Sequence, residues 1–179
     1  MSIEQKRVEA LRAYQILDTA PHPSFECVTR TAQAAFEAPI ALISLVDDYR
    51  QWFKACIGLD VRETPREFSF CAHAIEQDGV FVVENAETHP GFKTNPLVTG
   101  PPFIRFYAGA SILDPEGFAL GTVCVIDRTP RTINDRERKV LEGLADCAMN
   151  AITLHAQSIL LKRADRLIKR HLGRELDAA

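Results

Sequence analysis

Residues 105–127 read RFYAGASILDPEGFALGTVCVID, and this stretch decides the fold. It holds two runs rich in β-branched and aromatic residues, Arg105 to Leu113 and Phe118 to Ile126, which favour strands. Between them stands Asp114-Pro115-Glu116-Gly117, whose proline and glycine occupy positions that suit a turn. The pattern therefore predicts a β-hairpin.

Two further segments add strands to this hairpin. Ile40 to Val46 is an apolar run, Asp47 to Arg50 is a turn, and Gln51 to Ile57 is again rich in strand-forming residues. Val80 to Val83 is a fifth, shorter segment of the same character. Together these runs predict a sheet of at least five strands, mostly antiparallel.

Helical periodicity marks the rest of the chain. Ser2 with Gln5, and Asn134 with Glu137, have the spacing of a capping box, which marks a helix start. No glycine or proline interrupts residues 144–172, so the last helix is expected to span about 39 residues and roughly 58 Å. The expected helices run from Ser2 to about Leu17, from about Ser24 to Glu37, over a short segment capped by Ser69, and from Asn134 onward.

Two segments are expected to lack regular structure. Leu59 to Glu67 is rich in charged residues around Pro65 and is interpreted as a solvated connection. Asn85 to Pro102 is a long loop punctuated by proline and glycine. A loop of this length in a small domain is more often a binding element than a mere connection.

The composition of the chain limits the classes of function that it can have. The chain has 179 residues, 46% hydrophobic and 25% charged, and a net charge of −3, which is typical of one globular domain and gives no basic field for nucleic acid. Five cysteines without a Cys-x-x-Cys pair argue against a disulfide scaffold or a structural zinc site, and favour a cytoplasmic location. No apolar run approaches the ~18 to 20 residues of a membrane span, so no membrane contact is expected.

Several stretches of this sequence resemble the GAF domain family, and in particular a bacterial subfamily often found ahead of histidine kinase or diguanylate cyclase domains. The resemblance covers residues from about 7 to 155, and Ser111 departs from it where proline is common. It implies an α+β fold: a central antiparallel sheet of five to six strands, terminal helices on one face, and a ligand cavity on the other face beneath the short helix and long loop. The matching stretches are RAYQILDT (12–19), FCAHAI (70–75), NPLVTG (95–100), RFYAGA (105–110) and LGTVCVID (120–127).

The family label does not name a ligand, because one fold hosts unrelated functions. The Asn-Lys, Phe and Asp-Glu signature of cyclic-nucleotide-binding members is not found, and Cys71-Ala72-His73 is only superficially similar to a bilin attachment site. No cofactor, metal or catalytic residue is therefore assigned, and the ligand is left as an unidentified small molecule.

Five residues are the candidates for ligand binding: Phe70, His73, Phe103, Arg105 and Tyr107. Strand alternation would place Arg105 and Tyr107 on one face, where Arg105 would bind an anionic group. The alternative is that Arg105 forms a salt bridge with an acid such as Glu84 or Asp127 and holds the loop. Cys71 and His73 would diverge by about 200° around a helix, so we expect His73 to face the cavity while Cys71 faces the core. The cysteines are expected to be mostly inert, with Cys147 on the buried side of the last helix.

Three functions remain open at this point. The first is a non-enzymatic sensory domain that binds a small molecule and signals through its terminal helices. The second is a ligand-free dimerisation module whose cavity is filled by Phe70, Phe92, Phe103 and Phe106. The third is a cysteine-dependent reductase with the same fold, which needs cysteines that converge on the cavity.

The domain is expected to cover residues 1–155, and residues 156–179 to continue the last helix. Leu161 and Ile168 lie in an apolar seam flanked by basic residues, as in a coiled coil. We therefore expect a homodimer through the helices around Val8 to Leu17 and Leu141 to Leu172. Because no output domain follows residue 179 in this sequence, the signal is expected to pass to a second copy or to a separate kinase or cyclase chain.

Overall fold

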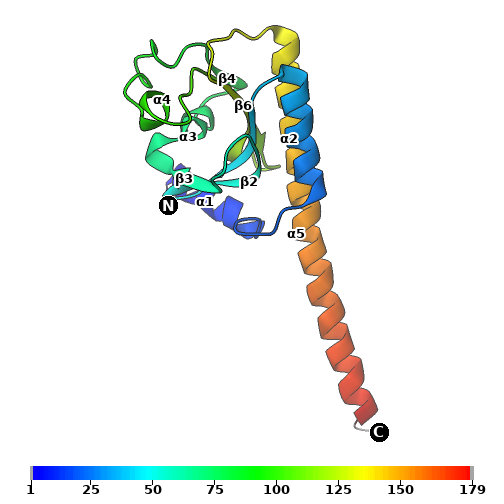
Figure 1. The fold of residues 1–179 in the computed structure, drawn as a ribbon. Helices are drawn as coiled ribbons and strands as arrows, with labels where there is room; N and C mark the ends of the chain where they lie inside the picture. Colours follow the sequence, from blue (N-terminus) through cyan, green and yellow to red (C-terminus); the bar gives the residue numbers. More distant parts are fainter. Residues whose placement is uncertain (1, 178–179) are drawn as a thin grey trace.

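The computed structural model describes residues 2–177, with side chains up to residue 171. Six antiparallel strands form one sheet in the order β3-β2-β1-β6-β5-β4, and the helices lie around it (Figure 1). The predicted α+β class is confirmed. The helices are α1 (Ile3–Ala13), α2 (Pro23–Phe36), α3 (Phe70–Ala74), α4 (Pro96–Thr99) and α5 (Asp135–Asp177), and the strands are β1 (Ile40–Val46), β2 (Arg50–Ile57), β3 (Glu63–Pro65), β4 (Val80–Val83), β5 (Phe106–Leu113) and β6 (Ala119–Asp127).

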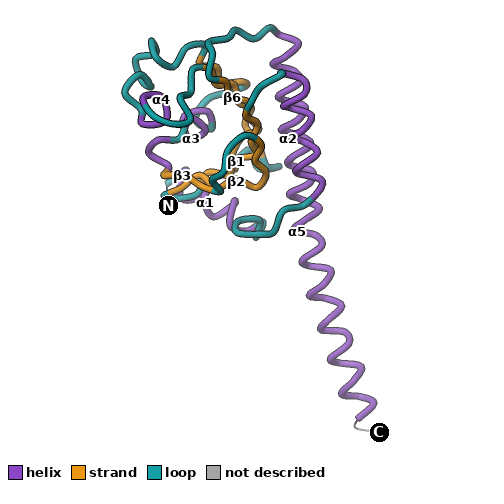
Figure 2. Tube along the Cα trace, viewed as in Figure 1, coloured by secondary structure: helices purple, strands orange, loops and turns teal. Residues whose placement is uncertain are grey.

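The sheet is buried on both faces. α2 and α5 run side by side along one face, whereas α3, α4 and the long loop lie on the other side of the molecule (Figure 2). Alternation along β5 sends Phe106 to the helix-covered face and Tyr107 to the loop-covered face. β1 and β6 are wholly buried because each pairs with a strand on both sides.

The helix starts follow from local capping. Ser2 and Gln5 exchange the two hydrogen bonds of a capping box, and Asn134 and Glu137 do the same at α5. The Ser69 hydroxyl accepts a hydrogen bond from the Ala72 amide and so caps α3. These three predicted starts are confirmed.

The segment expected to be a solvated connection contains regular structure. Within it, β3 pairs with β2 through Trp52 and Glu63, and a short 3-10 helix, Arg66–Phe68, follows. A three-residue strand that ends in proline carries little local signal. β3 is placed by its pairing with the outer edge of β2.

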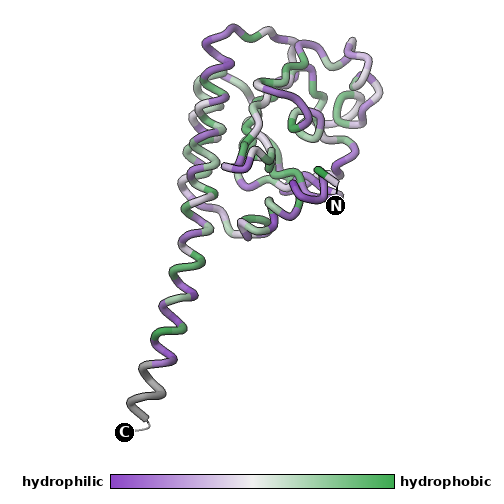
Figure 3. The backbone as a smooth tube through the Cα atoms, turned by 180° about the vertical axis from the view of Figure 1, so that it is seen from behind, coloured by the Kyte–Doolittle hydropathy of each residue, from purple (hydrophilic) through white to green (hydrophobic). Residues whose placement is uncertain are grey.

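α5 runs past the sheet and projects from the domain (Figure 1). Ile152 is its last fully buried residue. Beyond it, apolar and polar residues alternate along the projecting part (Figure 3), and its larger apolar side chains stay exposed: Leu154, Leu160, Leu161, Leu167 and Ile168. Leu172, the end of the predicted seam, lies outside the residues whose side chains are described.

Val8 and Leu11 of α1, which were expected near a dimer interface, are buried within the domain itself, and pairing of two chains stays a prediction. One expectation about the helices is wrong: Cys147 lies on the exposed side of α5, one residue before buried Ala148. Within residues 2–177, no helix combines the length and apolarity that crossing a bilayer demands.

Candidate functional site

A cavity of about 340 Å³ opens between the sheet and the segments that cover its second face. Its floor is made by side chains of the sheet, its cover by α3 and the long loop, and its mouth by the segment after β2 together with Arg128. The lining includes Leu42, Phe53 and Tyr107 in the floor, Phe70, Cys71 and Leu97 in the cover, and Asp60, Val61 and Arg128 at the mouth.

Aromatic stacking fixes the cover to the sheet. The Phe70 ring stacks on Phe92 with the centroids 4.1 Å apart, and also on Tyr107 at 5.4 Å. Phe81 of β4 lies 5.9 Å from the Tyr107 ring. Such pairs stabilise a contact beyond the area they bury, so α3 has a defined position above the floor.

Polar groups at one end of the cavity are already satisfied by one another. The Gln51 amide oxygen accepts hydrogen bonds from Ser69 (2.6 Å) and Ser44 (3.2 Å). Its amide nitrogen donates to the Thr64 hydroxyl at 2.5 Å. This network joins β1, β2, β3 and the cap of α3, and therefore shapes the wall.

Two buried sulfur atoms meet beneath the cover. Cys71 of α3 and Cys124 of β6 have their Sγ atoms 3.9 Å apart, and the Tyr107 hydroxyl donates to Cys71 Sγ at 3.4 Å. Burial raises the pKa of the Cys71 thiol, but hydrogen bonds to its sulfur, from Cys124 first and then from three hydroxyl groups, outweigh burial and lower the pKa to about 6. The hydrogen bond to Cys71, together with burial, raises the pKa of Cys124 well above that of a free thiol. The two thiols are therefore coupled, so that a change of charge on one alters the pKa of the other.

A larger hollow of about 460 Å³ lies between α2 and the end of β2, but its lining is mostly polar. Its buried cation, Lys54, donates to the Thr19 hydroxyl and the Ala20 carbonyl oxygen at 2.7 Å each. These bonds tie the linker between α1 and α2 to the sheet. The hollow lacks the apolar, aromatic wall that is typical of a small-molecule site.

Comparison with known proteins agrees with this arrangement. The GAF domain family model matches residues 20–152. The chain belongs to the GAF domain family. Its sequence is 49% identical over 138 residues to cyclic di-GMP phosphodiesterase PA2567 of Pseudomonas aeruginosa, a match that covers 76% of this chain and 24% of that protein. The chain thus spans about a quarter of the length of this relative.

Solved structures share the fold. The GAF domain of an Acinetobacter phosphoenolpyruvate-protein phosphotransferase superposes with a TM-score of 0.64 at 18% identity, over 89% of this chain and 98% of that one. Free methionine-R-sulfoxide reductase of Neisseria meningitidis gives 0.62 at 15% identity, over 88% and 95% of the two chains. At these identities the likeness concerns architecture and not activity.

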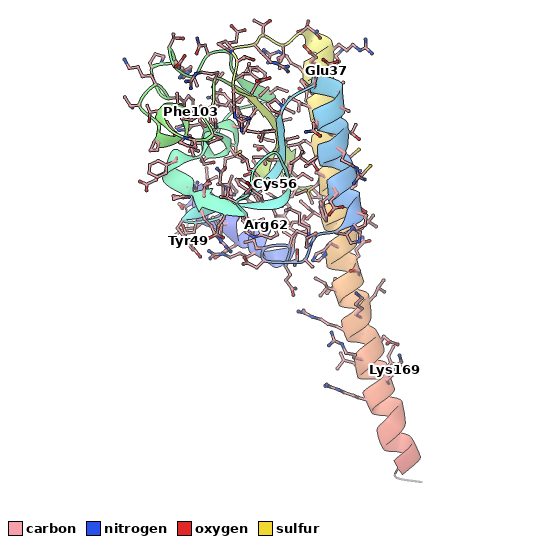
Figure 4. All side chains as sticks on the ribbon, in the orientation of Figure 1. Glu37, Tyr49, Cys56, Arg62, Phe103 and Lys169 are labelled. Carbon is pink, nitrogen blue, oxygen red and sulfur yellow. The ribbon has the colours of Figure 1, made fainter. Side chains whose placement is uncertain are left out.

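Two of the five predicted site residues line the cavity of this GAF domain, namely Phe70 and Tyr107. His73 does not: it is exposed on the outer side of α3, where its ring meets the edge of Phe92 at 5.0 Å. Cys71 and His73 lie on different sides of α3, as expected. The sides are exchanged, however, because Cys71 lines the cavity and His73 does not. Phe103, labelled on the covering loop in Figure 4, is 46% exposed and is not part of the lining.

Arg105 does not line the cavity, and instead of binding a ligand it forms a salt bridge with an acidic residue. Its guanidinium forms an ion pair with Glu87 at 2.8 Å and donates to the Val98 carbonyl oxygen at 2.9 Å. β5 begins at Phe106, so Arg105 precedes the strand and reaches the loop instead of the cavity. It holds the covering loop in place.

Arg128, which was not among the predicted site residues, stands directly after β6 at the mouth. Its Nε donates to the Pro102 carbonyl oxygen at 3.0 Å, and no carboxylate among the described residues forms an ion pair with it. The available signal was an arginine directly after a long apolar run. No group of three or more metal-ligating side chains gathers anywhere in the part of the chain that the structure describes.

Proposed function

We propose that this GAF domain is a non-enzymatic sensory domain that binds one small amphipathic molecule in the cavity. The observation that carries this proposal is the cavity of about 340 Å³ under an aromatic cover. That volume lies at the small end of the range for ligand sites, roughly 300 to 1,000 Å³. It favours a compact molecule.

The charges at the mouth narrow the ligand class. Phe70 and Tyr107 would contact the apolar body of the ligand, and Arg128 would bind an anionic group through its planar guanidinium. Asp60 also stands at the mouth, and its carboxylate would repel a ligand with several negative charges. The proposed ligand therefore carries one anionic group on a flat or apolar body.

We propose that occupancy reaches α5 through the sheet. Tyr107 on the floor and Phe106 on the α5 side are neighbours in β5, and α5 packs directly on that strand. The domain would comprise residues 1–155, and residues 156–179 would extend α5 as the output. Exposed Leu161 and Ile168 on this extension support pairing with a second copy.

The similarity to a cyclic di-GMP phosphodiesterase supports a regulatory role more than a catalytic one. The similar region is about a quarter of that protein, and the cavity has no pair of carboxylates at its floor. We propose that this chain corresponds to a sensing part of such a protein, and that output passes to a cyclase, phosphodiesterase or kinase activity.

The ligand class is tested with 1-naphthoate and its uncharged analogue 1-naphthalenemethanol, measured by isothermal titration calorimetry. Arg128→Gln should weaken naphthoate binding by about tenfold, since a hydrogen bond to a charged group contributes roughly 1.5 kcal/mol or more, and should leave the alcohol unaffected. Arg136→Gln is the matched control, because Arg136 is exposed on α5 and does not line the cavity. Equal losses in both variants, or no binding of either probe, would refute the assignment.

A further inference from the structure

The fold brings together two cysteines that lie 53 residues apart in the sequence. Cys71 and Cys124 are 2% and 0% exposed, their Sγ atoms are 3.9 Å apart, and both are free thiols. Only Cys71 lines the cavity, whereas Cys124 lies behind it in β6. One sulfur atom is thus open to a small molecule in the cavity, and the other is in reach of the first.

The groups around the two sulfur atoms suit a nucleophile in Cys71. The Tyr107 hydroxyl donates to Cys71 Sγ and lies 3.5 Å from the Thr122 hydroxyl. Hydrogen bonds directed at Cys71 Sγ stabilise its thiolate, and the thiolate is the reactive form of cysteine. Of the two sulfurs, only that of Cys71 borders the cavity, so the two have different roles.

We propose that Cys71 and Cys124 are a redox-active dithiol that a small hydroperoxide oxidises to a disulfide from the cavity. This redox reaction would be a second function beside ligand sensing, and it does not depend on the binding of a sensed ligand. In the first step, the Cys71 thiolate attacks one peroxide oxygen, the S–O bond forms and the O–O bond breaks. The remaining alkoxide or hydroxide takes up a proton and leaves as alcohol or water, and Cys71 becomes a sulfenic acid.

In the second step, the Cys124 sulfur attacks Cys71 Sγ. The S–S bond forms, the S–O bond breaks, and the departing hydroxide takes the thiol proton of Cys124 and leaves as water. In sum, two thiols and one hydroperoxide give one disulfide, one alcohol and one water. The two electrons lost by the sulfurs reduce the O–O bond.

Disulfide formation would change the cover of the cavity. The Sγ atoms must approach by about 2 Å to reach the S–S bond length. β6 is held by strands on both sides, whereas α3 is one five-residue helix. Closure would therefore draw α3 toward the sheet and alter the wall that Cys71 and Phe70 share.

The test uses the full chain with Cys27→Ser and Cys147→Ser, because these two exposed thiols would react on their own. The protein is treated with hydrogen peroxide or cumene hydroperoxide, free thiols are blocked with iodoacetamide, and the intact mass and the peptides are measured without reduction. The expected product has lost two hydrogens and links the peptides of Cys71 and Cys124, while Cys56 stays free.

Two further variants separate the steps. Cys124→Ser should accumulate a Cys71 sulfenic acid that dimedone traps, and Cys71→Ser should lower oxidation at position 124 by about tenfold. Cys56→Ser is the matched control and should leave the disulfide yield unchanged. The proposal is overturned if both thiols remain blockable at peroxide concentrations that oxidise Cys27 in the unmodified chain, or if the disulfide involves Cys56. The peptide map is measured on protein that keeps both Cys71 and Cys124. It therefore tests the proposal even if the Cys71→Ser or Cys124→Ser variant fails to fold.

Discussion

Gly109→Ala should destabilise the domain, because Tyr107 lies across the space where a side chain at position 109 would stand. A Cβ at Gly109 would come within 2.3 Å of the Tyr107 hydroxyl oxygen and 3.1 Å of Cys124 Cβ, whereas ordinary contact begins at 3.4 Å. The tyrosine ring must therefore move by about 1 Å or more. That movement breaks its hydrogen bond to Cys71.

The expected cost is the sum of two effects. Overpacking a core costs about 1 to 3 kcal/mol, and loss of a hydrogen bond by a buried hydroxyl costs about 1 to 3 kcal/mol. We expect the free energy of unfolding, measured by urea denaturation, to fall by about 3 kcal/mol. Adding Tyr107→Phe removes the oxygen atom that the new methyl group meets, so the double variant should lose less than the sum of the single losses.

Gly143→Ala is the matched control, since a Cβ there meets nothing within 4 Å. In the middle of α5 it should raise stability by about 0.5 to 1 kcal/mol. The reasoning is refuted if Gly109→Ala changes the free energy of unfolding by no more than about 0.5 kcal/mol, or if Tyr107→Phe gives no coupling with it.

Two further predictions concern the surface. A hydrogen bond from Arg7, supported by Arg66, lowers the pKa of the Glu4 carboxyl from 4.5 to about 2, so its contribution to stability is complete above pH 4.5 and is lost as the pH falls toward 2. Because the Glu4 side chain is 44% exposed, we expect a contribution of only about 1 kcal/mol. A carboxyl titration midpoint near 4.5 by NMR would contradict the contact. Leu161→Glu with Ile168→Glu should shift a dimer toward monomer in sedimentation without changing the unfolding midpoint, and an unchanged sedimentation coefficient would show that these side chains do not form the interface.

The sequence predicted the elements whose signal is local. The change from helical to strand periodicity at Ile40 and the caps at Ser2 and Asn134 set the right elements in the right order. β3 was missed because a three-residue segment that ends in proline has no periodicity of its own. α4 was missed although Asn95 followed by Pro96 is a helix start, with the Asn95 side chain accepting from the Leu97 amide.

The candidate site was predicted only in part, because it depends on tertiary placement. Strand alternation correctly placed Tyr107, but it was applied to Arg105, which lies before the strand begins. A five-residue helix does not reveal which side will face the sheet, so His73 and Cys71 were assigned the wrong way round. The approach of Cys71 to Cys124 has no signal in the sequence, since only the register of the sheet and the position of α3 bring them together.

Native mass spectrometry tests most directly whether the cavity holds a small molecule. The full chain is purified from its own host, and its native mass is compared with its denatured mass. We predict one additional small-molecule mass per chain, which is lost in Val61→Trp, a variant that blocks the mouth, and retained in Leu113→Trp, whose equally exposed side chain lies away from the cavity. Identical native and denatured masses, or an added mass that survives Val61→Trp, would contradict the account.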